Sequence, residues 1–201
     1  RHNINYYKSL LQKDTKLLCM VKAGSYGSDA KTMGRFLENT GVDYLGVAYP
    51  NEGVELRSKG IKLPILVMNC EEQLFAECIA HKLEPAIYSM NQLDSFIRVL
   101  INHSTTSYPI HIKLETGMNR LGFPENEIPS LIAALKSQPE VHVRSIYSHL
   151  AESDVIDSEY TRRQINLFGL MTEKITTQLP YPVLKHILNT EGITNYNDAQ
   201  M

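Results

Sequence analysis

The chain has 201 residues, a formal net charge of −2, 43% hydrophobic residues and 21% charged residues, which is typical of one globular domain, or at most two small ones. The near-neutral charge argues against nucleic acid as the main partner, because nucleic-acid binding usually needs a basic face. No apolar run reaches about 18 residues, so no membrane span is expected, and three scattered cysteines favour a reducing, cytoplasmic compartment.

Short apolar runs rich in β-forming residues alternate with amphipathic stretches along the whole chain. The runs predicted as strands are Leu17–Val21, Tyr44–Ala48, Ile65–Met68, Ala86–Tyr88, Ile110–Leu114, Val143–Ser148 and His186–Leu188. The stretches predicted as helices are His2–Gln12 (with an apolar stripe of Ile4, Leu10 and Leu11), Asp29–Asn39, Asn51–Lys59, Glu71–Lys82, Asn91–Asn102, Glu125–Ser137 and Asp157–Gln178. Gly41 and Gly60 follow two of these helices, as C-terminal caps often do.

This alternation indicates parallel strands joined by crossover helices. The strands are continuously apolar, which fits a sheet covered on both faces. Seven strands and about seven helices predict an α/β fold of the (β/α)8 TIM-barrel type, incomplete at its last strand and formed by residues 1–201 as one domain. A doubly wound open sheet is the alternative, weakened because no G-x-G-x-x-G motif follows a strand.

In a (β/α)8 barrel the active site lies at the C-terminal ends of the strands. Polar residues follow six of the predicted strands: Lys22, Asn51, Asn69, the segment Glu115–Arg120, Ser148 with His149, and Asn189 with Thr190. We therefore expect an amine, a guanidinium, an imidazole and a hydroxyl at one mouth. No His, Asp or Glu set has metal-ligand spacing, so no metal site is predicted.

Lys22 ends the apolar run Leu17–Val21. An apolar setting favours the neutral, nucleophilic amine and suits Schiff-base chemistry, although a strand-end lysine more often reaches out to water. The following Gly24-Ser25-Tyr26-Gly27 allows a tight loop whose backbone N–H groups meet an anion; an ordinary βα turn is the alternative. Taken alone, Arg120, His149 and Thr190 are equally consistent with a surface ion pair, a structural histidine and a helix cap.

Taken together, these stretches resemble the alanine racemase family. The matching segments keep the family order along nearly the whole chain: Met20-Val21-Lys22-Ala23 with Tyr26-Gly27, Val42–Ala48, Asn51–Arg57, Pro64–Met68, His111–Phe123, Tyr147–Ala151 and Ile187–Thr190. The most specific of them is Thr116-Gly117-Met118-Asn119-Arg120-Leu121-Gly122. The resemblance implies an N-terminal (β/α)8 barrel that binds pyridoxal phosphate (PLP), followed by a C-terminal β-domain.

The resemblance also implies a role for each site residue. Lys22 would carry PLP covalently and act as one of two catalytic bases. Tyr26 and Thr190 would hold the phosphate, Arg120 would reach the phenolic oxygen, and His149 would lie against the pyridine ring. Lys113 stands where the family often has a carbamylated lysine that orients the arginine, and Asn189 would line the same pocket. The implied substrate is alanine, with D-alanine supplied to peptidoglycan and a homodimer as the full-length assembly.

The sequence departs from the family at several positions. Gly24-Ser25 replaces the usual Asn-Ala, Ser28 replaces a histidine, and Thr190 replaces a serine. Glu191 replaces a small residue, and its carboxylate would repel a phosphate unless it points away. The chain begins at Arg1 and ends at Met201, about where an eighth strand should start, so we expect an incomplete barrel that does not racemise alanine efficiently by itself.

Two other functions remain open. A non-catalytic PLP carrier of the related single-barrel family shares the lysine-bearing first strand, but is not expected to carry the Thr116–Gly122 segment. A related decarboxylase, or a racemase for another amino acid such as serine, would use the same barrel. Side-chain specificity in this family depends partly on residues outside this sequence.

Overall fold

The computed structural model describes residues 1–201 and divides them into two compact units, Arg1–Ala86 and Ile87–Met201. Unit 1 contains the helices α1 (His2–Leu10), α2 (Lys22–Gly27), α3 (Ala30–Asn39), α4 (Pro50–Ser58) and α5 (Phe75–Ala80), with a 3-10 turn at Glu72–Leu74. Its strands are β1 (Leu18–Met20), β2 (Tyr44–Val47), β3 (Ile65–Val67) and β4 (Glu84–Ile87), whose last residue crosses the boundary.

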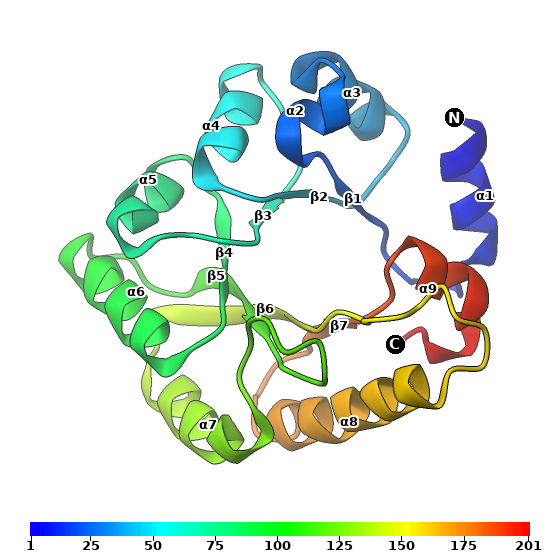
Figure 1. Ribbon diagram of the computed structural model, residues 1–201. Coiled ribbons are helices and arrows are strands. Elements are labelled where there is room, and N and C mark those ends of the chain that lie inside the picture. The colour runs from blue at the N-terminus through cyan, green and yellow to red at the C-terminus, as the bar shows by residue number, and fades with distance from the viewer. The chain divides into compact units, whose positions relative to one another are not determined.

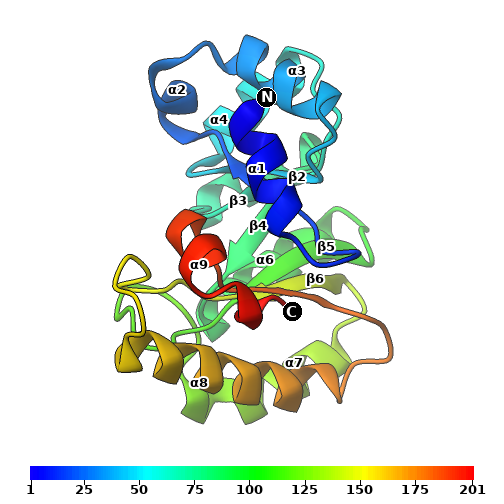
Figure 2. The same ribbon diagram turned by 90° about the vertical axis from the view of Figure 1, so that its right-hand side faces the viewer.

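Unit 2 contains the helices α6 (Met90–Asn102), α7 (Ile128–Ser137), α8 (Glu159–Thr176) and α9 (Thr190–Asn195). Its strands are β5 (Tyr108–Lys113), β6 (Val141–Tyr147) and β7 (Leu184–His186), and 3-10 turns lie at Glu125–Glu127 and Asn197–Ala199. Figure 2 shows α7 and α8 side by side beneath the strands of this unit, and the two helices are in contact.

The strands of each unit are parallel and follow one another in chain order, β1-β2-β3-β4 in unit 1 and β5-β6-β7 in unit 2. In Figure 1, α3, α4 and α5 run along the outer side of β1 to β4. A doubly wound sheet reverses its strand order at a switch point. Sequential order without reversal favours the predicted barrel type over that alternative.

Apolar side chains and capped helix ends explain these elements. All residues of β2 and β3 are buried, as expected for strands covered on both faces. Asp29 and Ser158 cap α3 and α8 by accepting N–H groups from Thr32 (2.6 Å) and Thr161 (3.0 Å), and each such cap contributes about 1 kcal/mol. Gly41 and Gly60 have positive φ values of 69° and 83°, which confirms their predicted capping role.

The predicted first helix is present as α1, where the stripe residues Ile4 and Leu10, with the adjacent Leu11, are half-buried and no residue is fully buried. Lys8 Nζ donates to the carbonyls of Thr40 (2.7 Å) and Gly41 (2.8 Å). Some other elements differ from the sequence prediction. The seventh strand is Leu184–His186 rather than His186–Leu188, because pairing with β6 aligns Ser145 with Leu184. The helices α2 and α9 were not predicted.

No helix of the structure combines the length and apolar character needed to cross a membrane.

Candidate functional site

Lys22 begins a left-handed turn at the end of β1. Ala23, Gly24, Ser25 and Tyr26 all have φ between 51° and 57°, a conformation that costs a non-glycine residue roughly 1–2 kcal/mol. The tight loop expected after Lys22 is a single left-handed helical turn. Three of its four left-handed residues are not glycine. Only Gly24 and Gly27 signalled it in the sequence.

Lys22 and Tyr26 both face solvent in unit 1. Lys22 is exposed, and Tyr26 is 65% exposed. Of the two settings that the sequence left open for Lys22, the structure has the second, a lysine at a strand end that reaches out to water. Its amine and the phenol of Tyr26 are both available to a ligand.

Glu52 is a residue that the sequence reasoning did not single out. Its Oε1 accepts the backbone N–H of Ala23 at 2.6 Å, and its Oε2 accepts those of Ala48 (2.7 Å) and Tyr49 (3.2 Å). One carboxylate thus ties the turn after β1 to the loop after β2. The usable signal was an acid three residues after the N-cap residue Tyr49, which is the position of a capping glutamate.

Unit 2 places the remaining candidate residues around β5, β6 and β7. Lys113 ends β5 and pairs in register with Tyr147 on β6, and Tyr147 pairs with His186 on β7. Lys113 Nζ lies 5.9 Å from the centre of the Tyr147 ring, and the Tyr147 and His186 rings stack at 5.0 Å with an interplanar angle of 3°. Two residues earlier on β5 and β6, His111 pairs in register with Ser145. Ser145 Oγ contacts His111 Nδ1 (2.6 Å) and also His186 Nε2 (3.3 Å).

Burial governs the titration of this polar layer. The pKa of Lys113 is lowered, first by burial and then by the positive charge of Arg120, with Glu115 opposing. Burial raises the pKa of Tyr147 above its usual range. Burial, followed by the nearby His111, lowers the pKa of His186 to about 3, so His186 is neutral at physiological pH.

The segment after β5 is built around Glu115 and Gly117. Glu115 accepts the backbone N–H groups of Gly117 and, at 3.3 Å, of Arg120. The Gly117 carbonyl accepts from Tyr160 Oη at 2.5 Å and Asn119 Nδ2 at 3.0 Å. The segment contains no helix, and the Arg120 side chain is exposed on it.

The structure also links the segment after β5 to the one after β6. Thr116 Oγ1 and Ser148 Oγ lie 2.7 Å apart, and Ser148 Oγ donates to the carbonyl of Leu114 at 2.9 Å. The adjacent His149 is half-buried, and its carbonyl accepts from Gln164 Nε2 at 3.1 Å. The segments carrying Arg120 and His149 are therefore brought together.

Asn189 and Thr190 lie at the start of α9. Asn189 caps this helix, because its Oδ1 accepts from the Gly192 N–H (2.9 Å) and from Ser153 Oγ (2.7 Å). Thr190 is the first helical residue, and both Thr190 and Glu191 are exposed. The cap role that was considered for Thr190 therefore belongs to Asn189.

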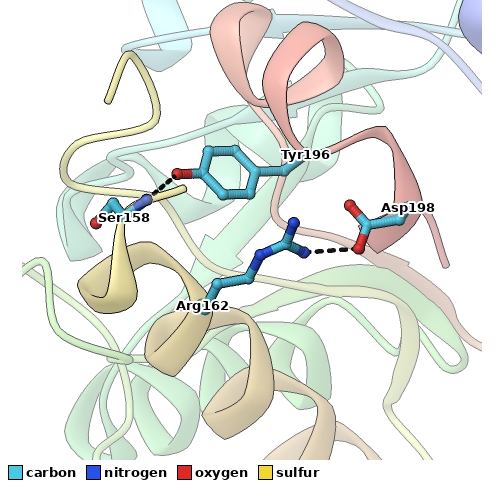
Figure 3. Close-up of polar contacts among 4 residues, drawn as sticks. All are labelled: Ser158, Arg162, Tyr196 and Asp198. Carbon is cyan, nitrogen blue, oxygen red and sulfur yellow. Dashed lines mark hydrogen bonds and ion pairs between the residues drawn. The ribbon is translucent and has the colours of Figure 1, made fainter. Parts of the chain in front are cut away.

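Tyr196 and Asp198 hold this C-terminal segment against α8, as Figure 3 shows. Tyr196 is fully buried; its Oη accepts the Ser158 N–H at 2.9 Å and donates to the Val155 carbonyl. Arg162 lies over the Tyr196 ring at 4.9 Å and pairs with Asp198 at 2.6 Å. The buried tyrosine is the stronger anchor, since exposed ion pairs contribute little.

A cavity of about 690 Å³ lies at the N-terminal ends of β5 and β6. Among its lining residues, Ser107 directly precedes β5 and Val141 begins β6. Barrel enzymes act at the C-terminal strand ends, so this cavity is not the candidate site.

The curated proteins similar to this chain include several alanine racemases. The alanine racemase of Sorangium cellulosum is 34% identical over 199 residues, which cover 96% of this chain and 52% of that protein. Alanine racemase 1 of Caldanaerobacter subterraneus is 31% identical over 203 residues, covering 100% of this chain and 52% of that protein. The chain thus spans about half the length of these curated relatives.

The solved structures similar to this chain also include alanine racemases. The alanine racemase of Clostridium difficile 630 matches with a TM-score of 0.91 and 30% identity, over 98% of this chain and 51% of that chain. The structure of a Clostridium difficile 630 alanine racemase complex with cycloserine matches with a TM-score of 0.93 and 31% identity, over 99% and 55%. The likeness confirms the predicted fold class, an incomplete (β/α)8 barrel.

The family model described as alanine racemase, N-terminal domain, matches residues 1–201, and the chain therefore belongs to that family.

Proposed function

We propose that residues 1–201 form the PLP-binding barrel domain of an alanine racemase. The whole protein would interconvert L- and D-alanine in the cytoplasm, as a homodimer, and supply D-alanine for peptidoglycan. The observation that carries the proposal is the exposed Lys22 amine at the end of β1, held in a strained left-handed turn. Strain of this kind gathers at functional sites, and the family match supplies the reaction.

The available side chains fit the chemistry of PLP. A phosphate and a phenolic oxygen need cationic or hydroxyl partners. Tyr26 and Thr190 carry exposed hydroxyl groups, and Arg120 is an exposed cation. Glu191, the departure from the family that directly follows Thr190, is also exposed. We assign the phosphate to Tyr26 and Thr190, the phenolic oxygen to Arg120, and the pyridine ring to His149, with Asn189 lining the pocket.

When bound, PLP supplies the electron sink that makes the Cα proton of an amino acid removable. In the proposed reaction Lys22 Nζ takes or returns that proton on one face, because a base at that position serves one direction of the interconversion. Inversion needs a second base on the opposite face. Glu115 accepts the backbone N–H of Arg120 and so holds the point where its side chain leaves the segment.

Labelling of Lys22 by PLP tests the assignment directly. We expect the purified chain to develop a visible absorbance band with PLP, and borohydride reduction to leave a stable adduct that mass spectrometry maps to Lys22. The variant Lys22→Ala should lose the adduct completely. Lys59→Ala, which removes another exposed lysine of unit 1, should keep it. An adduct spread evenly over surface lysines would contradict the proposal.

Substrate choice requires the whole protein. Racemisation of alanine and serine by the full-length enzyme, compared as kcat/KM, separates an alanine racemase from a broad-specificity one. A PLP adduct on Lys22 with no turnover of either amino acid would favour the carrier alternative.

We also propose that Lys113 is carbamylated. Burial and the charge of Arg120 lower its pKa, which enlarges the neutral amine fraction that attacks carbon dioxide. The nitrogen forms a bond to the carbon of CO2 and releases one proton, leaving a carbamate anion. Repulsion between Lys113 and Arg120 then becomes attraction, and this would orient the guanidinium.

Isotope-labelled bicarbonate checks this modification by NMR. We expect one carbamate signal from the chain at neutral pH that disappears on acidification. The signal should be absent from Lys113→Met and present in Lys136→Met, which removes an exposed lysine of the same unit. A signal that survives in Lys113→Met would place the carbamate elsewhere.

A further inference from the structure

Glu52 connects the two loops that follow β1 and β2. Its carboxylate is half-buried and accepts three backbone N–H groups, one from Ala23 and two from the consecutive residues Ala48 and Tyr49. The Ala23 bond spans 29 positions in sequence. It is therefore a tertiary contact between separate loops, in addition to the local cap that Glu52 makes at the start of α4.

The Ala23 N–H is the point where the left-handed turn leaves the strand. Ala23, Ser25 and Tyr26 hold positive φ values without the freedom of glycine, so the turn needs contacts that compensate for its strain. A hydrogen bond to a carboxylate is among the stronger ones available. Ala23 directly follows Lys22, so fixing its peptide group also fixes the direction in which the Lys22 side chain departs.

We infer that Glu52 is the positioning residue for Lys22: its carboxylate holds the Ala23 N–H and so sets where the Lys22 amine stands. The link to Lys22 chemistry rests on the proposed PLP function, whereas the link to the turn rests on the hydrogen bonds alone. In this role Glu52 would act through the backbone N–H groups that it accepts, and not by contact with PLP or substrate.

Glutamine cannot replace this carboxylate. The two oxygens of Glu52 divide three donors between them, one on Oε1 and two on Oε2. A glutamine offers one acceptor oxygen, and its NH2 group would face a backbone N–H that also donates. Glu52→Gln must therefore lose either the hydrogen bond to the Ala23 N–H or those to the Ala48 and Tyr49 N–H groups at the start of α4.

Glu38 provides a matched control in the same unit. Its Oε1 accepts the backbone N–H groups of Lys62 (2.9 Å) and Leu63 (3.2 Å). This carboxylate also ties a loop by its backbone, but the loop leads into β3 and lies far from Lys22 in sequence. Both bonds go to one oxygen, which a glutamine would retain. Glu38→Ala therefore serves as the control, because it removes both hydrogen bonds without loosening the Lys22 turn.

The experiment combines amide hydrogen exchange with PLP labelling on the whole chain. We expect Glu52→Gln to speed exchange in residues 21–29 by about tenfold or more, the factor for one lost hydrogen bond to a charged group. Glu38→Ala should leave exchange in that segment unchanged. The initial rate of borohydride-trapped PLP adduct at Lys22 should fall several-fold in Glu52→Gln only, and Glu52→Asp should restore part of it.

The outcomes separate the two claims. Unchanged exchange in residues 21–29 would overturn the role of Glu52 in holding the turn. Faster exchange with an unchanged Lys22 labelling rate would overturn its role in positioning the amine. If the wild-type chain acquires no adduct at Lys22, the PLP function fails, and the exchange rates alone decide whether Glu52 holds the turn.

Discussion

Replacing Gly122 with alanine is expected to destabilise the chain by about 3 kcal/mol or more. Gly122 has φ 139°, and an added Cβ would lie 2.5 Å from both the Glu115 nitrogen and the Leu114 carbonyl carbon. Both atoms belong to backbone, so no side-chain rotation relieves the clash. Positive-φ strain and forced backbone movement each cost about 1–3 kcal/mol. Urea unfolding of Gly122→Ala measures the loss as a lower midpoint at an unchanged slope.

The close approach at Gly122 closes the segment that carries Arg120. Phe123 N–H donates to the Lys113 carbonyl at 2.9 Å, and Glu115 N–H donates to the Phe123 carbonyl at 3.0 Å. Gly169 in α8 is the control, because a Cβ there meets nothing within 4 Å. Gly169→Ala should gain up to about 1 kcal/mol from helix propensity. Equal stability of the two variants would show that the segment opens without cost.

The sequence predicts the order of elements in this fold well, because each strand is a short apolar run flanked by breakers. Strand ends are less well defined: β5 and β6 begin two residues before their predicted starts, at Tyr108 and Val141. Strand β7 was placed two residues too late. Ile187 and Leu188 extend its apolar run, but Asn189 already caps the next helix, and a run of apolar letters does not show where pairing with β6 stops.

The conformation of the candidate site was harder to predict from the sequence than the order of the elements. Ala23, Ser25 and Tyr26 are not residue types that signal a left-handed turn, and Glu52, whose carboxylate accepts the Ala23 N–H, is remote in sequence. The layer of His111, Ser145, Tyr147 and His186 was also missed. A signal for it existed: His111 and Lys113, like Ser145 and Tyr147, are polar residues two apart within apolar strands, and such pairs share one face.

The free energy of unfolding of the chain should decrease as the pH is lowered, because His186 titrates differently in the folded and unfolded states. Its pKa is about 3 in the folded chain, against 6.5 when unfolded. Between these values the unfolded state binds a proton that the folded state does not, so stability decreases as pH falls below 6.5. At pH 5 the difference in proton binding amounts to about 2 kcal/mol, at about 1.4 kcal/mol per pKa unit.

The variant His186→Phe isolates this effect from the titration of carboxylates. A phenylalanine keeps an aromatic ring on Tyr147, and Ser145 keeps its contact with His111. Between about pH 7.5 and pH 5 the wild-type chain should lose about 2 kcal/mol more than His186→Phe does in urea unfolding. The exposed His103, changed to glutamine, should follow the wild type. If all three chains lose the same stability, His186 accepts its proton without unfolding, and the stack on Tyr147 must tolerate an imidazolium.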